Sequence, residues 1–413
     1  MSDTTRAAER RLREDLPTIE AVGRLLKEGA DPHKSSLLGE FSRLFLSRAS
    51  EEVLRQRSPE DLAAMSSSAF DFLGVSRPFR VDVSVVNPTK SGTWADAVTV
   101  ISTNVSERPF IIDSIREYLA GEEISIELMI YPIIDVERDK KGSVLGVTDP
   151  SDGGSKESIV HLEISRIEDL PRLAEMAKDL TTRLQDVVRS TDDFRPMIDS
   201  VESVIESVGR NIVDMPDRAE EFEEIQHFLG WLRDGGFIFL GSRRYDLVEI
   251  EEHDEPAIVV EPGSGLGLLR NEGESRFAAP IPISKLEPGV RELAIQGPVL
   301  IINKTNAEST VHRRSRMDYV GVKKLDERGN VVGEHRFIGL FTSKAYAEPA
   351  GSIPILRHKL AKVLEASSVR EGSHDYKEII TIFDSLPKEQ LLLASADELG
   401  EDVRAVLATY GGG

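Results

Sequence analysis

The hydrophobic repeat of this chain switches several times between the helical and the strand period, and this alternation limits the fold more than any other sequence feature. Apolar residues recur at helical spacing up to about residue 75. They then alternate with polar residues from Phe79 to Val85 and again from Ala97 to Val105. Further helical and strand-like runs follow to the end of the chain. The pattern predicts an α+β protein.

Three sites carry the residues that start helices. Ser58-Pro59 combines an N-cap serine with proline at the first helical position. Ser106 to Pro109 precedes an apolar face that ends at Gly121, and Asp169 to Pro171 precedes a long amphipathic stripe that continues to Val188. The first of these helices belongs to a helical lead-in, and the other two follow strands.

The second half of the chain is rich in short strand-like runs separated by glycine and charged turns. Asp326 to Asn330 is predicted as the tip of a hairpin. Pro196 and Pro216 punctuate a charged helical stretch, so a domain boundary is predicted near Asp214 to Ala219. From Ile353 to Tyr410 helical spacing returns.

Length and composition narrow the class of protein. A chain of 413 residues exceeds the roughly 250 to 300 residues that one core supports, so two or three domains are expected. The net charge of -21 disfavours a nucleic-acid partner, because phosphate backbones bind basic surfaces. The absence of cysteine, of a signal peptide and of an apolar run of ~20 residues predicts a cytoplasmic protein without a membrane partner.

No catalytic, cofactor or metal motif stands out. The glycine-rich run from Gly263 to Gly267 follows a predicted strand but has the spacing G-x-G-x-G, and no helix opens after it, so a tight turn is favoured over a dinucleotide loop. His161 and Glu163 share one face of a predicted strand, where the interpretation is a solvated or interface face rather than a metal site. No catalytic residue, cofactor site or metal site is predicted.

Two groups of residues are candidates for binding. The segment around Asn104, Ser106, Glu107 and Arg108 joins a strand end to a helix N-terminus, whose free amides suit a carboxylate, although ordinary helix capping explains it as well. The second group is a basic patch, predicted to bind an anion or to face an acidic partner surface. Its members are Lys304, His312, Arg313, Arg314 and Arg316.

Several segments, in order and spacing, resemble the N-terminal part of the large bacterial NAD-specific glutamate dehydrogenases. They include RPFIIDSI, IELMIYPIIDVERD, ESIVHLEI, WLRDGGFIFLGSRRYDL, GSGLGLLR, STVHRRSRMDYVGVKK and HRFIGLFTSKAY. The resemblance implies a ferredoxin-like ACT domain over Ala97 to Val188 and a PAS-like antiparallel β domain over Phe228 to Tyr346. It yields the division 1–76 helical lead-in, 77–190 ACT-like domain, 191–227 helical connector, 228–348 PAS-like domain and 349–413 C-terminal helices.

Two departures from the family pattern follow. No strand follows Val188 to complete the βαββαβ order, so Phe79 to Val86 is predicted to supply the fourth strand. The segment Asn104 to Arg108 lacks the glycine of many ACT ligand loops.

The resemblance implies a non-catalytic regulatory and assembly segment. In the family, glutamate and NAD are converted to 2-oxoglutarate, ammonia and NADH, but no Rossmann fingerprint or catalytic lysine motif occurs in these 413 residues. NAD is therefore expected in the full-length enzyme only, and the expected partners are the catalytic part, further copies of the chain and an amino-acid effector. The alternatives are a purely structural oligomerisation module, a stand-alone ligand-binding regulator, and catalysis at the Gly263 turn or the His312 patch.

Overall fold

The computed structural model describes residues 17–27, 32–75, 81–88, 98–250 and 255–410. The chain forms two compact units. The first contains the residues up to Val188 together with Thr310–Arg314, and the second contains Arg189–Ser309 and the chain from Ser315 onward. The five segments expected from the sequence are a finer division and stay a prediction.

The first unit is built on a six-stranded antiparallel sheet. Its central strands, β2 and β6, pair over their full length, from Val98 opposite Ser165 to Ser106 opposite Glu157. The spatial order is β1-β2-β6-β4-β5, and β3 pairs with β6 next to β4. The strands are β1 (Asp82–Val86), β2 (Val98–Ser106), β3 (Ile126–Ile130), β4 (Ile133–Arg138), β5 (Val144–Thr148) and β6 (Lys156–Ser165).

The strand before the ACT-like region completes this sheet, as predicted. β1 pairs antiparallel with β2, with Val83 opposite Thr103. The start of the predicted strand at Phe79, and Ala97 at the start of the next one, lie outside the described residues. The run from Ile126 to Arg138, by contrast, is two strands rather than one, because Pro132 has no amide to donate to the ladder. The hairpin strand β5 was not predicted.

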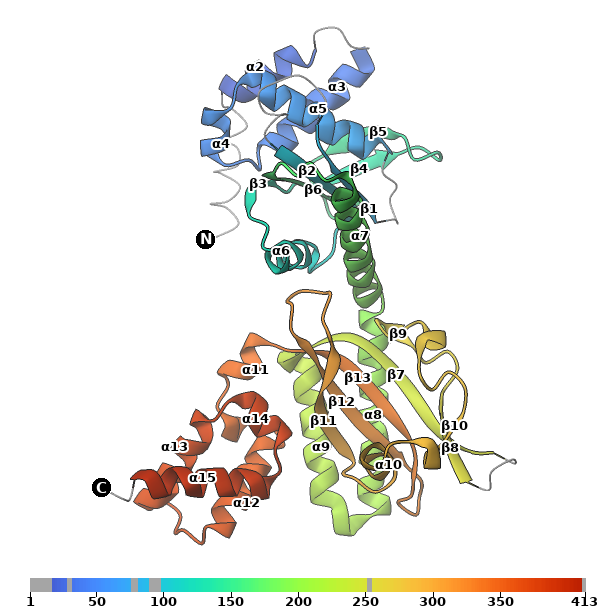
Figure 1. The fold of residues 1–413 in the computed structure, drawn as a ribbon, viewed down its shortest axis with the longest axis vertical. Helices are drawn as coiled ribbons and strands as arrows, with labels where there is room; N and C mark the ends of the chain where they lie inside the picture. Colours follow the sequence, from blue (N-terminus) through green and yellow to red (C-terminus); the bar gives the residue numbers. More distant parts are fainter. Residues whose placement is uncertain (1–16, 28–31, 76–80, 89–97, 251–254, 411–413) are drawn as a thin grey trace. The chain divides into compact units, whose positions relative to one another are not determined.

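Helices cover both faces of this sheet (Figure 1). The helices α6 (Ile111–Gly121) and α7 (Leu170–Asp192) lie on one side. The lead-in helices lie on the other side, where their apolar residues form one core with Val100, Leu128 and Ile159 of the sheet. The lead-in is therefore a packed layer. Its helices are α2 (Pro17–Leu25), α3 (Pro32–Leu46), α4 (Glu51–Gln56) and α5 (Pro59–Val75).

The second unit contains a seven-stranded antiparallel sheet in the order β10-β8-β7-β13-β12-β11, with the short β9 paired to β7. The hairpin predicted at Asp326 to Asn330 is confirmed: it joins β12 to β13, and the amide of Gly329 donates to the carbonyl of Asp326. The strands are β7 (Phe237–Ile250), β8 (Glu255–Val260), β9 (Leu266–Gly267), β10 (Ile281–Pro282), β11 (Leu300–Glu308), β12 (Arg316–Leu325) and β13 (Val331–Phe341).

Two long helices, α8 (Phe194–Asp214) and α9 (Ala219–Trp231), pack on one face of the second sheet, where Phe222 and Phe228 share a core with Phe337. The predicted boundary near residues 214–219 is thus a turn inside this unit, because Pro216 interrupts the helix while the shared core keeps both halves together. The remaining helices are α10 (Pro288–Ile295), α11 (Ser343–Ala347), α12 (Leu356–Ala366), α13 (His374–Ser385), α14 (Lys388–Leu393) and α15 (Ala396–Tyr410).

The α+β class predicted from the periodicity is confirmed by these two antiparallel sheets and their helices. Within the ranges that the structure describes, none of the helices combines the length and the apolar character needed to cross a membrane.

Candidate functional site

The predicted ligand segment lies at the turn between β2 and α6 in the first unit. β2 ends at Ser106, and the amide of Glu107 extends the ladder by one more bond, to the carbonyl of Lys156 at 2.9 Å. Phe110 precedes α6 with a left-handed backbone (φ 73°), and its side chain makes no capping hydrogen bond with the described residues of the helix. The turn therefore leaves the Glu107 side chain close to the first turn of a helix.

Glu107 is the centre of a small polar cluster. The hydroxyl of Tyr131, from the connection between β3 and β4, donates to its carboxylate at 3.4 Å. The fully buried Ser158 of β6 lies beside both groups, and among the described residues no partner meets the geometry of a hydrogen bond with its hydroxyl. Burial raises the pKa of Glu107 against the opposing effect of these hydroxyls, and burial also raises the pKa of Tyr131. A half-buried carboxyl group beside two hydroxyls suits a polar ligand that donates hydrogen bonds.

Arg108 is tied to the main chain beside this cluster. Its guanidinium donates to the carbonyl of Ser106 at 3.0 Å and to that of Val188, at the end of α7, at 3.4 Å. These bonds fix the turn against α7. Arg108 thus serves first as an anchor, and Ser106 contributes its carbonyl to the same anchor.

Asn104 belongs to a different network on the opposite face of the sheet. Its amide group donates to Glu157 at 2.6 Å, and Arg138 binds the same carboxylate through two nitrogens at 2.7 and 2.8 Å. The Arg138 and Glu157 side chains are 5% and 2% exposed. The structure therefore separates Asn104 from the Glu107 cluster. Sequence reasoning missed Tyr131, Ser158, Arg138 and Glu157, because strand pairing alone brings them into place.

His161 and Glu163 do lie on one face of β6, 3.3 Å apart. Both are fully buried, and the guanidinium of Arg57, at the end of α4, pairs with Glu163. The interpretation of this face as solvated is wrong, because the lead-in helices cover it. The pair is part of a buried ion-pair network.

The residues of the predicted basic patch are divided between the two units. His312, Arg313 and Arg314 lie in the first unit, where the ring of His312 meets Asp113 at 2.9 Å and the amide of Arg314 donates to Glu117 at 3.0 Å.

The other two members of the patch, Lys304 and Arg316, belong to the second unit. Lys304 pairs with Asp318 at 2.7 Å and with Glu389 at 3.1 Å. The ring of His312 and the ammonium group of Lys304 thus lie against acidic side chains of the same chain, as expected of structural contacts rather than of an open anion site.

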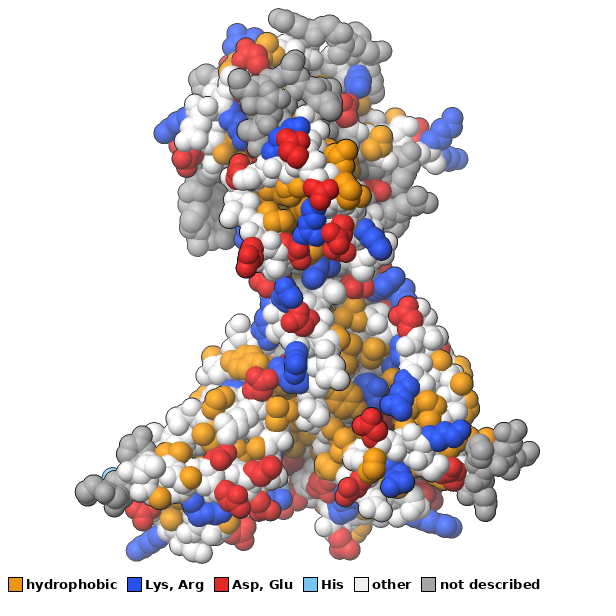
Figure 2. All heavy atoms as spheres, viewed as in Figure 1, with side chains coloured by type: hydrophobic (Ala, Val, Ile, Leu, Met, Phe, Trp, Pro, Cys, Tyr) orange, Lys and Arg blue, Asp and Glu red, His pale blue; other side chains and the backbone are white. Residues whose placement is uncertain are grey.

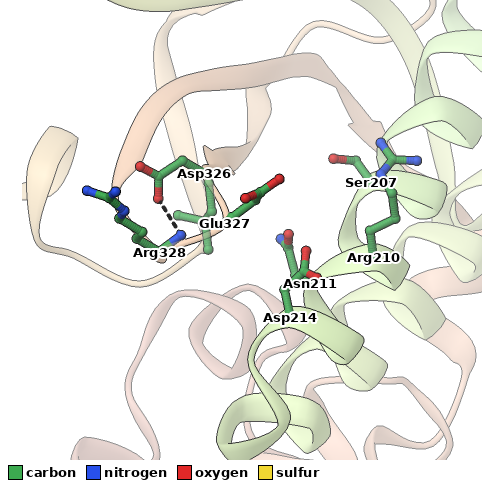
Figure 3. A pocket seen from close by; sticks show the side chains of 8 residues that line it. Ser207, Arg210, Asn211, Asp214, Asp326, Glu327 and Arg328 are labelled. Atoms are coloured by element: carbon green, nitrogen blue, oxygen red, sulfur yellow. Dashed lines mark hydrogen bonds between the residues drawn. The ribbon is translucent and has the colours of Figure 1, made fainter.

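A pocket of about 550 Å³ opens in the second unit between the end of α8 and the hairpin tip (Figure 3). Glu327 points toward α8 and Arg328 points away, while the Asp326 carboxylate accepts the amides of Arg328 and Asn330 within its own turn. Mixed charges of this kind favour neither an anion nor a cation. The lining residues are Ser207, Arg210, Asn211, Asp214, Leu325, Asp326, Glu327 and Arg328.

One group with metal-ligating atoms occurs in the described part of the chain, formed by His374, Asp375 and Glu378. Its ligand atoms lie within 4.8 Å of one another at the exposed start of α13. The positive end of the helix dipole opposes a cation there. The Glu107 cluster is therefore the better candidate site.

Comparison with protein families matches two parts of the chain. Residues 41–180 match the description "Glutamate dehydrogenase, ACT1 domain", and residues 353–411 match "Glutamate dehydrogenase, helical motif 1". The first match begins inside α3, so the family domain includes part of the helical layer as well as the sheet and the Glu107 cluster.

Three curated relatives named NAD-specific glutamate dehydrogenase align with most of the chain. The protein of Pseudomonas aeruginosa is 31% identical over 376 residues, which is 89% of this chain and 22% of the relative. That of Halomonas elongata is 27% identical over 95% of this chain and 24% of its own length. That of Mycobacterium tuberculosis is 25% identical over 72% and 17%. The chain thus spans about a quarter of the length of the first two relatives.

Proposed function

We propose that this chain, which corresponds to the N-terminal region of the NAD-specific glutamate dehydrogenase family, is the regulatory and assembly segment of such an enzyme and senses a small polar ligand. Glutamate oxidation with NAD then belongs to the catalytic part, in the same or a separate chain. The cytoplasm is the expected compartment. The antiparallel sheet of the second unit corresponds, in this proposal, to the PAS-like domain that the family resemblance implies.

The observation that carries the sensing role is the half-buried carboxyl group of Glu107 at the β2–α6 turn of an ACT-type sheet. Its neighbours Tyr131 and Ser158 supply hydroxyl groups, and within the described ranges the hydroxyl of Ser158 has no partner at hydrogen-bonding geometry. An ammonium group of an amino acid complements this acceptor-rich cluster. A ligand bound at this cluster would act on the β2–α6 turn, which the hydrogen bond from Arg108 to Val188 connects to α7.

Isothermal titration of the chain with each of the common amino acids tests this role. We expect at least one of them to bind, and Glu107→Gln to weaken that binding at least tenfold. Glu123→Gln is the matched control, because Glu123 lies exposed just beyond the other end of α6. Equal loss in both variants, or binding by no amino acid, leaves only the assembly role.

The purely structural alternative makes a different prediction. An oligomerisation module forms a defined oligomer in light scattering without ligand, and its mass does not change with Glu107→Gln. A sensor changes its mass or thermal stability with the amino acid. Glutamate-dependent NADH formation by this chain alone would overturn both readings.

A further inference from the structure

The glycine-rich turn after β8 binds two carboxylates of its own chain. Gly263 and Gly267 have left-handed backbones, with φ of 75° and 59°, which glycine adopts without strain. A Cβ atom at Gly265 would lie 2.5 Å from the carbonyl oxygen of Leu269. The three glycines thus fold the backbone so that its N–H groups converge, as in the concave anion sites that successive amides form.

The turn has two positions that bind a carboxylate, called seats, and Glu272 occupies the first. Its carboxylate accepts the amide of Gly263 at 3.1 Å and that of Gly265 at 2.8 Å. The amide of Ser264 between them donates to the carbonyl of Glu261. Burial acts to raise the pKa of Glu272, but the backbone amides of this turn outweigh it and hold the pKa below its usual range. The turn therefore prefers a charged oxyanion in this position.

Asp193 fills the second seat, where it accepts the amide of Gly267 at 2.7 Å and pairs with Arg270 at 2.5 Å. The Asp193 side chain is 10% exposed. Glu272 is held differently: in the described part of the chain its hydrogen bonds come from main-chain amides, and the nearby guanidinium of Arg243 is bound to the carbonyls of Leu269 and Asn271. Glu272 is partly exposed, and among the residues that the structure describes no lysine or arginine side chain donates a hydrogen bond to its carboxylate.

We propose that the Gly263–Gly265 turn is an oxyanion-binding site of the second unit that Glu272 keeps filled, and that the carboxylate or phosphate of a small ligand takes this seat when Glu272 leaves it. The exchange needs only a side-chain rotation, because Glu272 lies at the surface in a short 3-10 turn over Glu272–Glu274. In the described chain the next helical element after the turn is the short 3-10 turn over Glu272–Glu274, so a single oxyanion fits the glycine turn better than a dinucleotide pyrophosphate.

Chemical rescue tests the proposal. Glu272→Ala empties the seat, and we expect the melting temperature of the full chain to fall by about 2 to 4 °C, because the amides of Gly263 and Gly265 lose their acceptor. Sodium formate should restore at least half of this loss relative to sodium chloride at equal ionic strength. Sodium phosphate in a parallel series separates the two ligand chemistries, since rescue by one salt alone identifies the oxyanion that fits.

Glu274→Ala is the matched control, because Glu274 lies in the same turn and its carboxylate meets the side chain of Asn271 at 2.6 Å instead of the amides. Rescue of Glu272→Ala beyond that of Glu274→Ala supports the site. Equal rescue of both variants, or rescue of neither, overturns it. If Glu272→Ala does not fold, Glu272→Asp provides the same readout, because the shorter side chain leaves the seat partly open.

Discussion

The two sheets of this protein accommodate charged side chains in different ways. The first sheet has helices on both faces, and Glu157 and Glu163 lie fully buried between the sheet and the lead-in helices, each paired with an arginine. The second sheet has its long helices on one face. On its other face Arg336 of β13 lies 4.1 Å from the ring centre of Tyr245 and 5.1 Å from that of Tyr319, on the neighbouring strands.

The difference teaches where each unit is most sensitive to substitution. A buried ion pair gives little net stability while it is intact but costs much when one partner is removed. An arginine between aromatic rings that is 23% exposed keeps part of its hydration, so its loss costs less. Surface charges, which Figure 2 shows with both signs intermixed, contribute least.

The largest effect is expected from Arg138→Leu in the first unit. It leaves the Glu157 carboxylate buried without its two guanidinium bonds, and we expect the first unit to lose about 3 to 5 kcal/mol of unfolding free energy. Hydrogen exchange of the β6 amides measures this loss. Arg55→Leu is the control in the same unit, because its pair with Glu51 is exposed and its loss should cost under about 1 kcal/mol. Equal costs would remove the contrast between buried and surface pairs.

The second unit should be sensitive to acid through His335. Burial, with Lys324 and Arg244 nearby, lowers the pKa of His335 from 6.5 to about 4. The unfolded chain therefore binds this proton more tightly, and stability is lost as the pH falls from about 6.5 to 4, by about 2 to 3 kcal/mol.

The fluorescence of Trp231 follows this acid transition in a Trp94→Phe background, because these are the two tryptophans of the chain. His335→Gln should flatten the pH dependence in that window. The pKa of the Glu261 carboxyl is lowered to about 2 by its bonds with Arg244 and Lys324, so this group changes the unfolding free energy only below about pH 4.5. If stability depends on pH in the same way in His335→Gln, another group causes the acid sensitivity.

A smaller effect is expected from Arg336→Lys. Lysine keeps the charge but cannot stack flat on both rings or reach the hydroxyl of Tyr245, which the guanidinium meets at 3.1 Å. We expect a loss of about 1 to 2 kcal/mol in urea unfolding of the second unit. Arg276→Lys, at an exposed position 5.9 Å from the ring centre of Phe277, should change stability by less than half of that amount.

Local signals predicted much of the fold. The period of two located β1 and β2, and the sequence from Asp326 to Asn330 located the hairpin tip, because each is encoded by neighbouring residues. The division of Ile126 to Arg138 into two strands depended on the single Pro132. That the lead-in helices cover the sheet did not follow from the sequence, because an amphipathic face does not specify its partner.

The candidate site was less predictable than the fold. Asn104 and Glu107 are three residues apart, yet the strand places Asn104 on the face of the lead-in helices, while Glu107 joins Tyr131 and Ser158. Tyr131 and Ser158 are distant in sequence, and only the pairing of β6 with its neighbours brings them to the turn. These contacts depend on the pairing register of the strands, which the local pattern of one segment does not specify.

The smallest effect tests the helical layer that distinguishes the first sheet. Ser58 was predicted to cap α5, and its hydroxyl accepts the amide of Asp61 at 3.1 Å. Ser58→Ala should cost about 1 kcal/mol, whereas Ser58→Asp should keep the stability because a carboxylate accepts the same amide and suits the helix dipole. Since α5 shares its core with the sheet, hydrogen exchange should show the Ser58→Ala loss in the β6 amides too. A loss confined to α5 would mean that the layer opens independently of the sheet beneath it.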